Sequence, residues 1–187
     1  MNSSASVNGD ERIRLFVAYT LAPDDRERIA AWQQTELVGS RARVVRPEQL
    51  HFTIAFLGPR PRAEIEPIAE VIRGAALGAG PMPLEISRYR ETRSVGMLVF
   101  EDSSGEATRV AEAIQRGLEE IGAYRPEARP WLPHITVLRF RRPPRLHPEL
   151  PVLGQVSPSE AAAYHSLLRR DGAQYVVLHS VALGGRC

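Results

Sequence analysis

One four-residue pattern, histidine, apolar residue, threonine, apolar residue, occurs twice in this chain. The copies are His51-Phe52-Thr53-Ile54 and His134-Ile135-Thr136-Val137, one in each half of the sequence. Each lies in a run of β-branched and aromatic residues bounded by proline or glycine, which is typical of a β-strand. Because strand side chains alternate between two faces, histidine and threonine share one face and the apolar residues point into a core. The pattern therefore predicts two strands that each present an imidazole beside a hydroxyl.

Predicted strands and helices alternate along the rest of the chain. Apolar periodicity and turn residues predict strands at 12–20, 49–58, 84–89, 95–101, 131–140, 152–168 (with an interruption) and 174–183. Helices are predicted after Pro23-Asp24-Asp25 with a stop at Gly39, after Pro59 and Pro61, which end the first motif strand, and after the capping-box pattern Ser103-Ser104-Gly105-Glu106. This order predicts an α+β fold with a weak internal two-fold similarity.

The length and composition fit one globular unit. A chain of 187 residues, 43% hydrophobic, can bury a core as one domain or as two small lobes that share it. We expect residues 1–11 to be disordered and residues 12–187 to form a single bilobal domain. No apolar stretch approaches the roughly 18 residues of a membrane span, and Met1 to Gly9 lacks an export signal, so we expect a cytoplasmic protein without membrane contact. The single cysteine, Cys187, excludes a disulfide framework and a cysteine-based zinc site.

The choice of basic residues limits the chemistry. All 24 basic residues are arginine and lysine is absent, while the formal net charge is only +2. Schiff-base chemistry, a Walker-type phosphate loop and a lysine-nucleotide intermediate of an ATP-driven ligase each need a lysine amine, so all three are excluded. Arginine remains well suited to phosphate, because its planar fork binds two oxygens at once.

Two histidines that face one substrate can act together, one as general acid and the other as general base. Histidine titrates near neutrality, so one ring can be charged while the other is neutral. In-line displacement at phosphorus needs this arrangement, since one group takes a proton from the attacking oxygen and the other protonates the leaving oxygen. A threonine on the same strand face can donate to a non-bridging phosphate oxygen. This chemistry requires no metal, and the sequence has no HExxH, CxxC or Asp-rich spacing, so we expect no metal and no cofactor.

A structural role for the histidines is the alternative interpretation. A single His-x-Thr in a strand is most often a satisfied structural histidine. Two copies in similar contexts favour a functional pair over chance repetition. His147, His165 and His179 have no such context and are interpreted as surface or structural residues.

The two motifs and their surroundings resemble the two-histidine (2H) phosphoesterases, and within them the RNA 2',3'-cyclic phosphodiesterase branch long labelled 2'-5' RNA ligases. The matching segments are Arg14–Ala18, Leu50–Gly58, Pro133–Arg139, and a closing pattern that includes Ser166, Gly172, Tyr175 and Gly184. The resemblance thus covers roughly residues 12–184. It implies a bilobal α+β fold in which two antiparallel sheets with outer helices line a central cleft with pseudo-two-fold symmetry.

The resemblance also implies a reaction and a role for six residues. A 2',3'-cyclic phosphate at an RNA end or on a nucleoside is opened to a 2'-phosphate without a metal. His51 is expected to protonate the leaving 3' oxygen and His134 to activate water. Substrate-binding roles fall to Thr53, Thr136, Arg139 and Phe56. Strict alternation puts Phe56 and Arg139 on the face opposite the histidines, so both assignments need a β-bulge or a strand end.

Other functions of the same fold stay open at this point. The enzyme could act on 2'-5' linked oligonucleotides or on another cyclic phosphate, including the reverse 2'-5' ligation, or the chain could bind RNA without catalysis. We expect a monomer. A basic rim for the RNA backbone is predicted from the arginines that flank the motifs, namely Arg41, Arg43, Arg46, Arg141, Arg142 and Arg145.

Overall fold

The computed structural model describes residues 11–37, 42–169 and 172–184. Its strands are β1 (Arg12–Tyr19), β2 (Arg43–Val44), β3 (Phe52–Pro61), β4 (Leu84–Glu91), β5 (Val95–Asp102), β6 (His134–Arg139), β7 (Gln155–Val156), β8 (Glu160–Arg169) and β9 (Gly172–Ala182). Its helices are α1 (Pro23–Glu36), α2 (Ile65–Ala76) and α3 (Glu106–Glu120), with short 3-10 turns η1 (Pro47–Gln49) and η2 (Arg62–Glu64). The predicted helix stop at Gly39 and most of the predicted disordered segment lie outside the described residues. The proposed domain bounds therefore stay a prediction.

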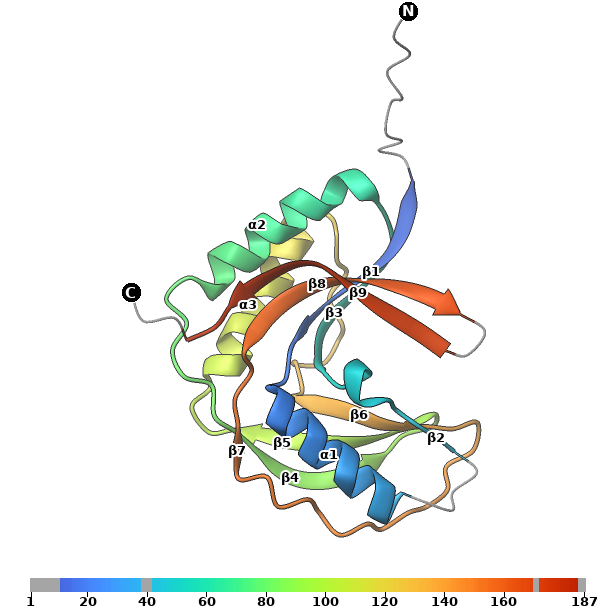
Figure 1. The fold of residues 1–187 in the computed structure, drawn as a ribbon. Helices are drawn as coiled ribbons and strands as arrows, with labels where there is room; N and C mark the ends of the chain where they lie inside the picture. Colours follow the sequence, from blue (N-terminus) through green and yellow to red (C-terminus); the bar gives the residue numbers. More distant parts are fainter. Residues whose placement is uncertain (1–10, 38–41, 170–171, 185–187) are drawn as a thin grey trace, which may run out of the picture.

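The strands form one curled antiparallel sheet made of two halves. Its order is β7-β4-β5-β6-β3-β1-β8-β9, with β2 paired to β6. One half contains β3, β1, β8 and β9, and the other contains β6, β5, β4 and β7 (Figure 1). Within the described chain, β3 and β6 meet at one residue pair, Phe52 with Ile135. The α+β class with two antiparallel halves is confirmed, and the two expected sheets are joined through this pair.

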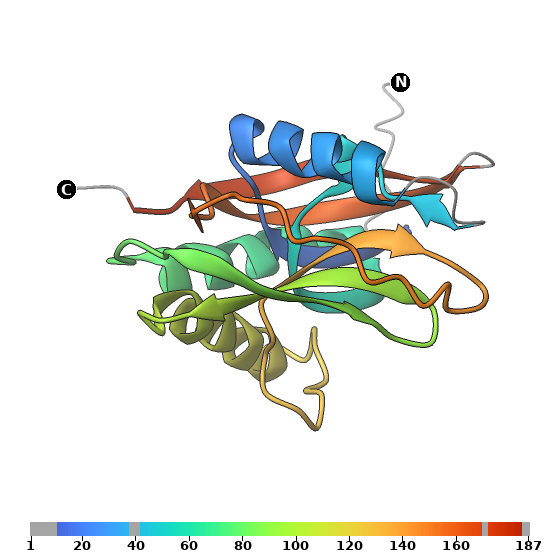
Figure 2. The ribbon, with the colours of Figure 1, turned by 90° about the horizontal axis from the view of Figure 1, so that it is seen from below.

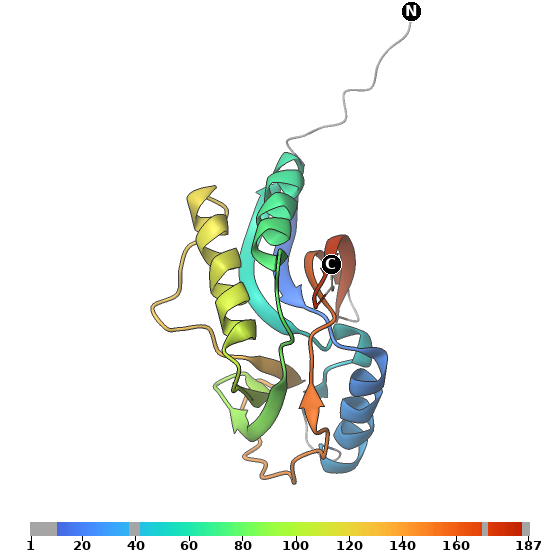
Figure 3. The ribbon, with the colours of Figure 1, turned by 90° about the vertical axis from the view of Figure 1, so that its left-hand side faces the viewer.

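The helices cover the sheet at two separate places. Figure 3 shows α2 and α3 side by side, with α1 at the other end of the molecule. Helix α2 buries Ile68 and Ile72, and α3 buries Ile114 and Leu118, as the helical spacing of their apolar residues requires. A Cβ on Gly117 of α3 would lie 2.7 Å from a methyl group of Val71 on α2. Glycine at this position therefore allows the two helices to pack closely.

The core lies on the sheet face away from the motif polar side chains. Phe52 and Ile135 are fully buried, and the rings of Phe52 and Phe100 meet edge to face at 4.9 Å. Figure 2, seen from below, shows the half with β4 and β5 nearest the viewer and β8 with β9 behind it. The apolar residues of each motif thus hold the two strands in place from behind.

The first motif strand is longer than the sequence indicated. Pro59 and Pro61 do not end β3, because they continue its pairing with β1 opposite Arg14 and Arg12. After Phe52, the described part of β3 has a partner strand on one side only. Proline is tolerated at such an edge, since no ladder hydrogen bond on the open side is lost.

The predicted capping box at the start of α3 is also wrong. The N-cap is Gly105, in a left-handed conformation with φ 72°, which glycine adopts without strain. The Ser104 hydroxyl accepts the Glu106 N–H at 3.2 Å, and the Asp102 carboxylate accepts the Thr108 N–H at 2.7 Å. Two of the free N–H groups of the first turn are therefore satisfied by side chains that precede the helix.

Candidate active site

Both motif histidines are held in the same tautomer by the main chain. Nδ1 of His51 lies 2.7 Å from the carbonyl oxygen of Gln49, and Nδ1 of His134 lies 2.8 Å from that of Leu132. A carbonyl oxygen only accepts, so each Nδ1 carries the hydrogen and donates it. In the described part of the chain neither Nε2 has a hydrogen-bond partner. Each ring thus presents Nε2 as the atom available for proton transfer.

The register between β3 and β6 relates the two motifs by a local two-fold axis. Phe52 pairs with Ile135, and each residue directly follows its motif histidine. Because the strands are antiparallel, one step along this register brings His51 beside Thr136 and His134 beside Thr53. Histidine of one motif and threonine of the other therefore lie next to each other on the face opposite the core.

A β-bulge lies at the last residue of each motif. The pairing of β3 with β1 skips Ile54, and the pairing of β6 with β5 skips Val137. Two consecutive buried residues result in each strand, Ile54 with Ala55 and Val137 with Leu138. The bulges return Phe56 and Arg139 to the face of the motif histidines, as their expected roles require.

A glutamine from a helix holds the carbonyl of each bulged residue. The side chain of Gln115, on α3, donates to Ile54 O at 2.8 Å. The side chain of Gln33, on α1, donates to Val137 O at 2.8 Å and to Val45 O at 3.1 Å. Gln33 is only 2% exposed. Sequence reasoning missed both residues, since a single glutamine in a helix gives no signal of what it contacts.

All six expected site residues line one pocket of about 770 Å³. His51, Thr53 and Phe56 come from the first motif region, and His134, Thr136 and Arg139 come from the second. The Thr53 and Thr136 hydroxyls have no hydrogen-bond partner among the described residues, so both are free to meet a ligand. His147, His165 and His179 are not part of the described lining. The roles of the six residues stay predictions.

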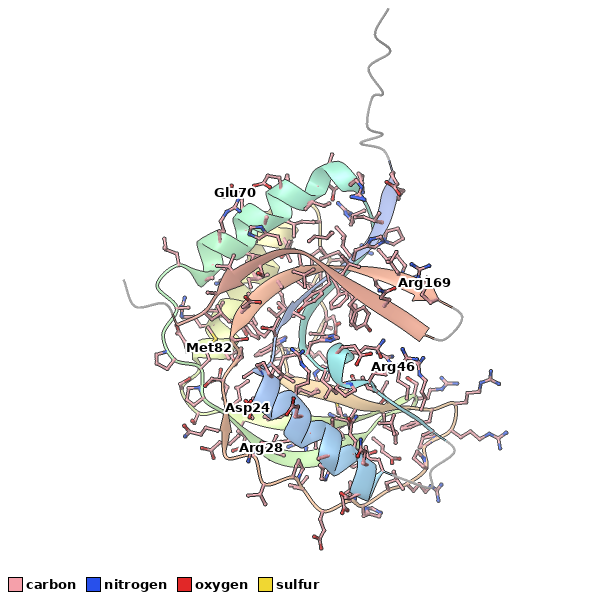
Figure 4. All side chains as sticks on the ribbon, in the orientation of Figure 1. Asp24, Arg28, Arg46, Glu70, Met82 and Arg169 are labelled. Carbon is pink, nitrogen blue, oxygen red and sulfur yellow. The ribbon has the colours of Figure 1, made fainter. Side chains whose placement is uncertain are left out.

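The pocket is strongly basic. Its lining includes the arginines Arg14, Arg43, Arg90, Arg129, Arg139 and Arg169, whereas Glu127 is the one acid among the described lining residues. Glu127 is neutralised by an ion pair with Arg129 at 2.9 Å. Figure 4 shows Arg169 at the end of β8, on the right of the view, while Glu70 lies on the outer surface of α2. Such a pocket attracts an anion.

Aromatic residues from other strands surround His51. The ring centroids of Phe16 and Tyr175 lie 5.0 Å and 5.5 Å from that of His51, and Tyr164 stacks on Phe16. The Gln49 side chain donates to the carbonyl oxygen of Ala173, at the start of β9. The Gln49 carbonyl oxygen accepts from His51, so Gln49 connects β9 to this histidine. These neighbours come from β1, β8 and β9, so motif spacing could not reveal them.

Burial makes both imidazoles weaker bases. Burial, with smaller contributions from the charges of Arg139 and His134, lowers the pKa of His51 to about 4 against the opposing effect of the hydrogen bond to Gln49. Burial also lowers the pKa of His134, with a smaller contribution from the charge of Arg129. Both rings are therefore mainly neutral at pH 7 in the free protein.

The threonine of the first motif has a further main-chain contact. The Trp131 indole N–H donates to the carbonyl oxygen of Thr53 at 2.8 Å, and the Trp131 ring meets Tyr19 edge to face at 5.7 Å. Trp131 precedes the second motif, so this bond connects the loop before one motif to the strand of the other.

The described residues contain neither a cluster of metal ligands nor a helix that could span a membrane. In residues 11–37, 42–169 and 172–184, no three His, Cys, Asp or Glu side chains are placed to share a metal ion. Over the same ranges, no helix has both the length and the apolarity needed to cross a bilayer.

Known proteins are similar to this chain in sequence and in fold. The family model described as the 2'-5' RNA ligase superfamily matches residues 21–172. The RNA 2',3'-cyclic phosphodiesterase of Thermus thermophilus is 31% identical over 184 residues, which cover 92% of this chain and 91% of that protein. The crystal structure of TT0787 from the same organism has a TM-score of 0.76 at 28% identity, covering 94% of this chain and all of that one. Apo LigT from E. coli has a TM-score of 0.78 at 24% identity, covering 94% and 99%, and so shares the fold.

These matches confirm the family that the two motifs indicated. The family model covers most of the described chain, and the T. thermophilus relative extends over nearly its whole length. The chain belongs to the 2'-5' RNA ligase superfamily.

Proposed function

We propose that this protein hydrolyses 2',3'-cyclic phosphates, at RNA ends or on nucleosides, to 2'-phosphates. The observation that carries the proposal is the pair of free Nε2 atoms on His51 and His134. The register between β3 and β6 relates the two histidines by a local two-fold axis, and both line one basic pocket. The relative from T. thermophilus is named an RNA 2',3'-cyclic phosphodiesterase, and it is 31% identical over almost the whole chain. Geometry and relationship thus support the same reaction.

In the proposed reaction, a water molecule attacks phosphorus in line with the bond to the 3' oxygen. Neutral His134 takes a proton from the water at Nε2, the new P–O bond forms, and the bond to the 3' oxygen breaks. Protonated His51 gives its Nε2 proton to the departing oxygen. The reaction leaves His51 neutral and His134 charged, and exchange with solvent restores the starting state.

The remaining pocket residues bind and orient the phosphate. The free hydroxyls of Thr53 and Thr136 donate to the non-bridging oxygens, where charge gathers in the transition state. The guanidinium of Arg139 pairs with the same oxygens, and the exposed ring of Phe56 supports the base. Bound phosphate also explains how a buried histidine becomes an acid, because its negative charge raises the pKa of His51. No step in this scheme uses a metal.

The proposal is tested by incubating the protein with a nucleoside 2',3'-cyclic phosphate in excess EDTA and identifying the product by phosphorus NMR. We expect the 2'-phosphate as the sole product, at a rate unchanged by EDTA. Formation of the 3'-phosphate would show that the bond from phosphorus to the 2' oxygen breaks instead of the bond to the 3' oxygen. Loss of activity in EDTA would contradict the metal-free scheme. Tight binding without turnover would instead support the non-catalytic RNA-binding function.

The expected monomer and the choice between related substrates are separate questions. Light scattering in solution measures the oligomeric state. A panel containing 2'-5' linked dinucleotides and a nucleotide-sugar cyclic phosphate, each compared by kcat/KM, measures which linkage the pocket prefers. We expect the nucleoside 2',3'-cyclic phosphate to give the highest value.

A further inference from the structure

A second depression adjoins the candidate active site. It has a volume of about 810 Å³ and is lined by Ala42, Arg43, Arg139, Phe140, Arg141, Arg142 and Pro144. Two of these residues, Arg43 and Arg139, also line the pocket that holds the histidines. The two hollows therefore adjoin at these two arginines.

The second depression has cationic side chains without anionic partners. Four of its lining residues are arginines and none of those described is an acid. In the described part of the chain, no carboxylate forms an ion pair with Arg43, Arg139, Arg141 or Arg142. Some arginines elsewhere on the surface are neutralised, as Arg60 is by Glu64 at 2.6 Å and Arg109 by Glu106 at 2.7 Å. Four cations without an anionic partner in the described chain thus lie together beside the active site.

The acid at the adjoining end of β4 is already used by the main chain. The two carboxylate oxygens of Glu91 accept the N–H groups of Arg145 and Leu146, each at 2.9 Å. Arg145 has a φ of 59°, an unusual conformation for a residue other than glycine, and this conformation turns two successive N–H groups toward one anion. The Phe140 N–H donates to Ser94 O at 3.0 Å. These bonds fix the arginine-bearing segment and leave its guanidinium groups free of Glu91.

The other lining residues of the depression are apolar. Ala42, Phe140 and Pro144 contribute apolar surface, and Phe140 packs against the core from a partly buried position. A lining that combines arginines with aromatic and aliphatic side chains suits a nucleotide, whose phosphate pairs with arginine and whose base and sugar contact apolar surface. A free inorganic anion would make no use of the apolar residues.

We propose that this depression binds the nucleotide on the 5' side of the reacting end, with Arg141 and Arg142 on its phosphodiester. The inference rests on the proposed function. A 2',3'-cyclic phosphate occupies the 3' terminus of a strand, so the strand continues from it only in the 5' direction. The preferred substrate is therefore an RNA strand with a cyclic end, and a mononucleotide uses only the first pocket.

The test compares a nucleoside 2',3'-cyclic phosphate with RNA oligomers of two to six nucleotides that carry the same terminal group. Wild type is compared with Arg141→Gln/Arg142→Gln, and with Arg62→Gln/Arg73→Gln as the control, which removes the same charge from residues that line neither hollow. The measured quantities are kcat/KM at several salt concentrations and the thermal unfolding midpoint.

We expect wild type to favour the oligomers, and Arg141→Gln/Arg142→Gln to lose about tenfold or more in kcat/KM on them while the nucleoside substrate is unaffected. The salt dependence of the oligomer reaction should also become shallower, by about 0.7 in log–log slope for each phosphate that the variant no longer neutralises. Equal losses on both substrates, no loss on the oligomers, or the same loss in the control would overturn the proposal.

Failure of the proposed function gives a different result. If wild type does not turn over the nucleoside cyclic phosphate, binding of a fluorescent oligomer with a 2'-phosphate end is measured by anisotropy with the same variants. Weaker binding by Arg141→Gln/Arg142→Gln alone would still support the second site, and unchanged binding would exclude it.

Discussion

Phe52 of β3 and Ile135 of β6 are the residue pair through which the two halves of the sheet meet. Both side chains are fully buried, while the histidine before each and the threonine after each line the pocket on the other face. A shift of this register by one residue would turn the motif polar groups into the core. One apolar pair therefore fixes where both imidazoles lie.

The first prediction concerns the pH dependence of kcat/KM, which reports ionisations of the free enzyme. The pKa of His51 is about 4 and that of His134 is also lowered, so each ring loses its proton at a lower pH than an ordinary histidine. Activity requires His51 to be protonated and His134 to be neutral, so we expect a bell-shaped profile with one limb near pH 4 and the other below about 6.5, the ordinary histidine value. Initial rates between pH 3 and pH 9 check this, and an optimum above pH 7 would contradict it.

The second prediction concerns the threonine hydroxyls. Thr53→Val and Thr136→Val keep the side-chain shape and remove a donor that the described protein itself does not use. Each should lower kcat by about 10²-fold, as loss of one transition-state donor does, with the free energy of unfolding changed by less than about 0.5 kcal/mol. Thr35→Val, on α1 and outside the pocket, is the matched control. Wild-type turnover in either motif variant would remove that hydroxyl from the mechanism.

The third prediction concerns base stacking on Phe56, whose side chain is 65% exposed and lines the pocket. Phe56→Ala should raise KM by about 5-fold to 160-fold, since stacking of one base contributes roughly 1–3 kcal/mol, and should leave kcat nearly unchanged. Leu77→Ala, which removes another exposed apolar side chain outside the pocket, should change neither constant. A fall in kcat with KM constant would show that Phe56 acts on the chemistry instead.

The fourth prediction concerns the support of the second bulge. Gln33→Leu leaves Val137 O and Val45 O without their side-chain donor, so the free energy of unfolding should fall by about 1–3 kcal/mol. Gln33 does not line the pocket, and a purely structural role would leave the kinetics of the folded protein intact. We expect KM to rise as well, because the bulge places Arg139. Gln155→Leu, an exposed control bonded to the Glu85 side chain, should show neither effect.

Much of the site could be predicted because strand periodicity is local. Alternation alone places His51 on the same strand face as Thr53, and His134 on the same face as Thr136. It also shows that Phe56 and Arg139 can reach that face only if a bulge intervenes. The structure has a bulge in both strands, at Ile54 and at Val137.

The neighbours of the motifs could not be predicted in this way. Phe16 and Tyr175 reach His51 from strands that are distant in sequence, and periodicity tells which face a residue occupies but not what lies across from it. The same limit explains Pro59 and Pro61, which looked like strand ends. Their place in β3 depends on which edge of that strand lacks a partner, and this is a property of the assembled sheet.

The most direct test of the central claim, that both imidazoles act on one phosphate, is a double-mutant comparison. The kcat of wild type, His51→Ala, His134→Ala and the double variant is measured on a nucleoside 2',3'-cyclic phosphate, with His147→Ala as a control outside the pocket and circular dichroism to verify folding. We predict that each single variant loses at least about 10²-fold and that the double variant loses far less than the product of the two, because groups acting in one concerted step are not additive. Near-normal turnover in either folded single variant, or losses that simply multiply, would contradict the account.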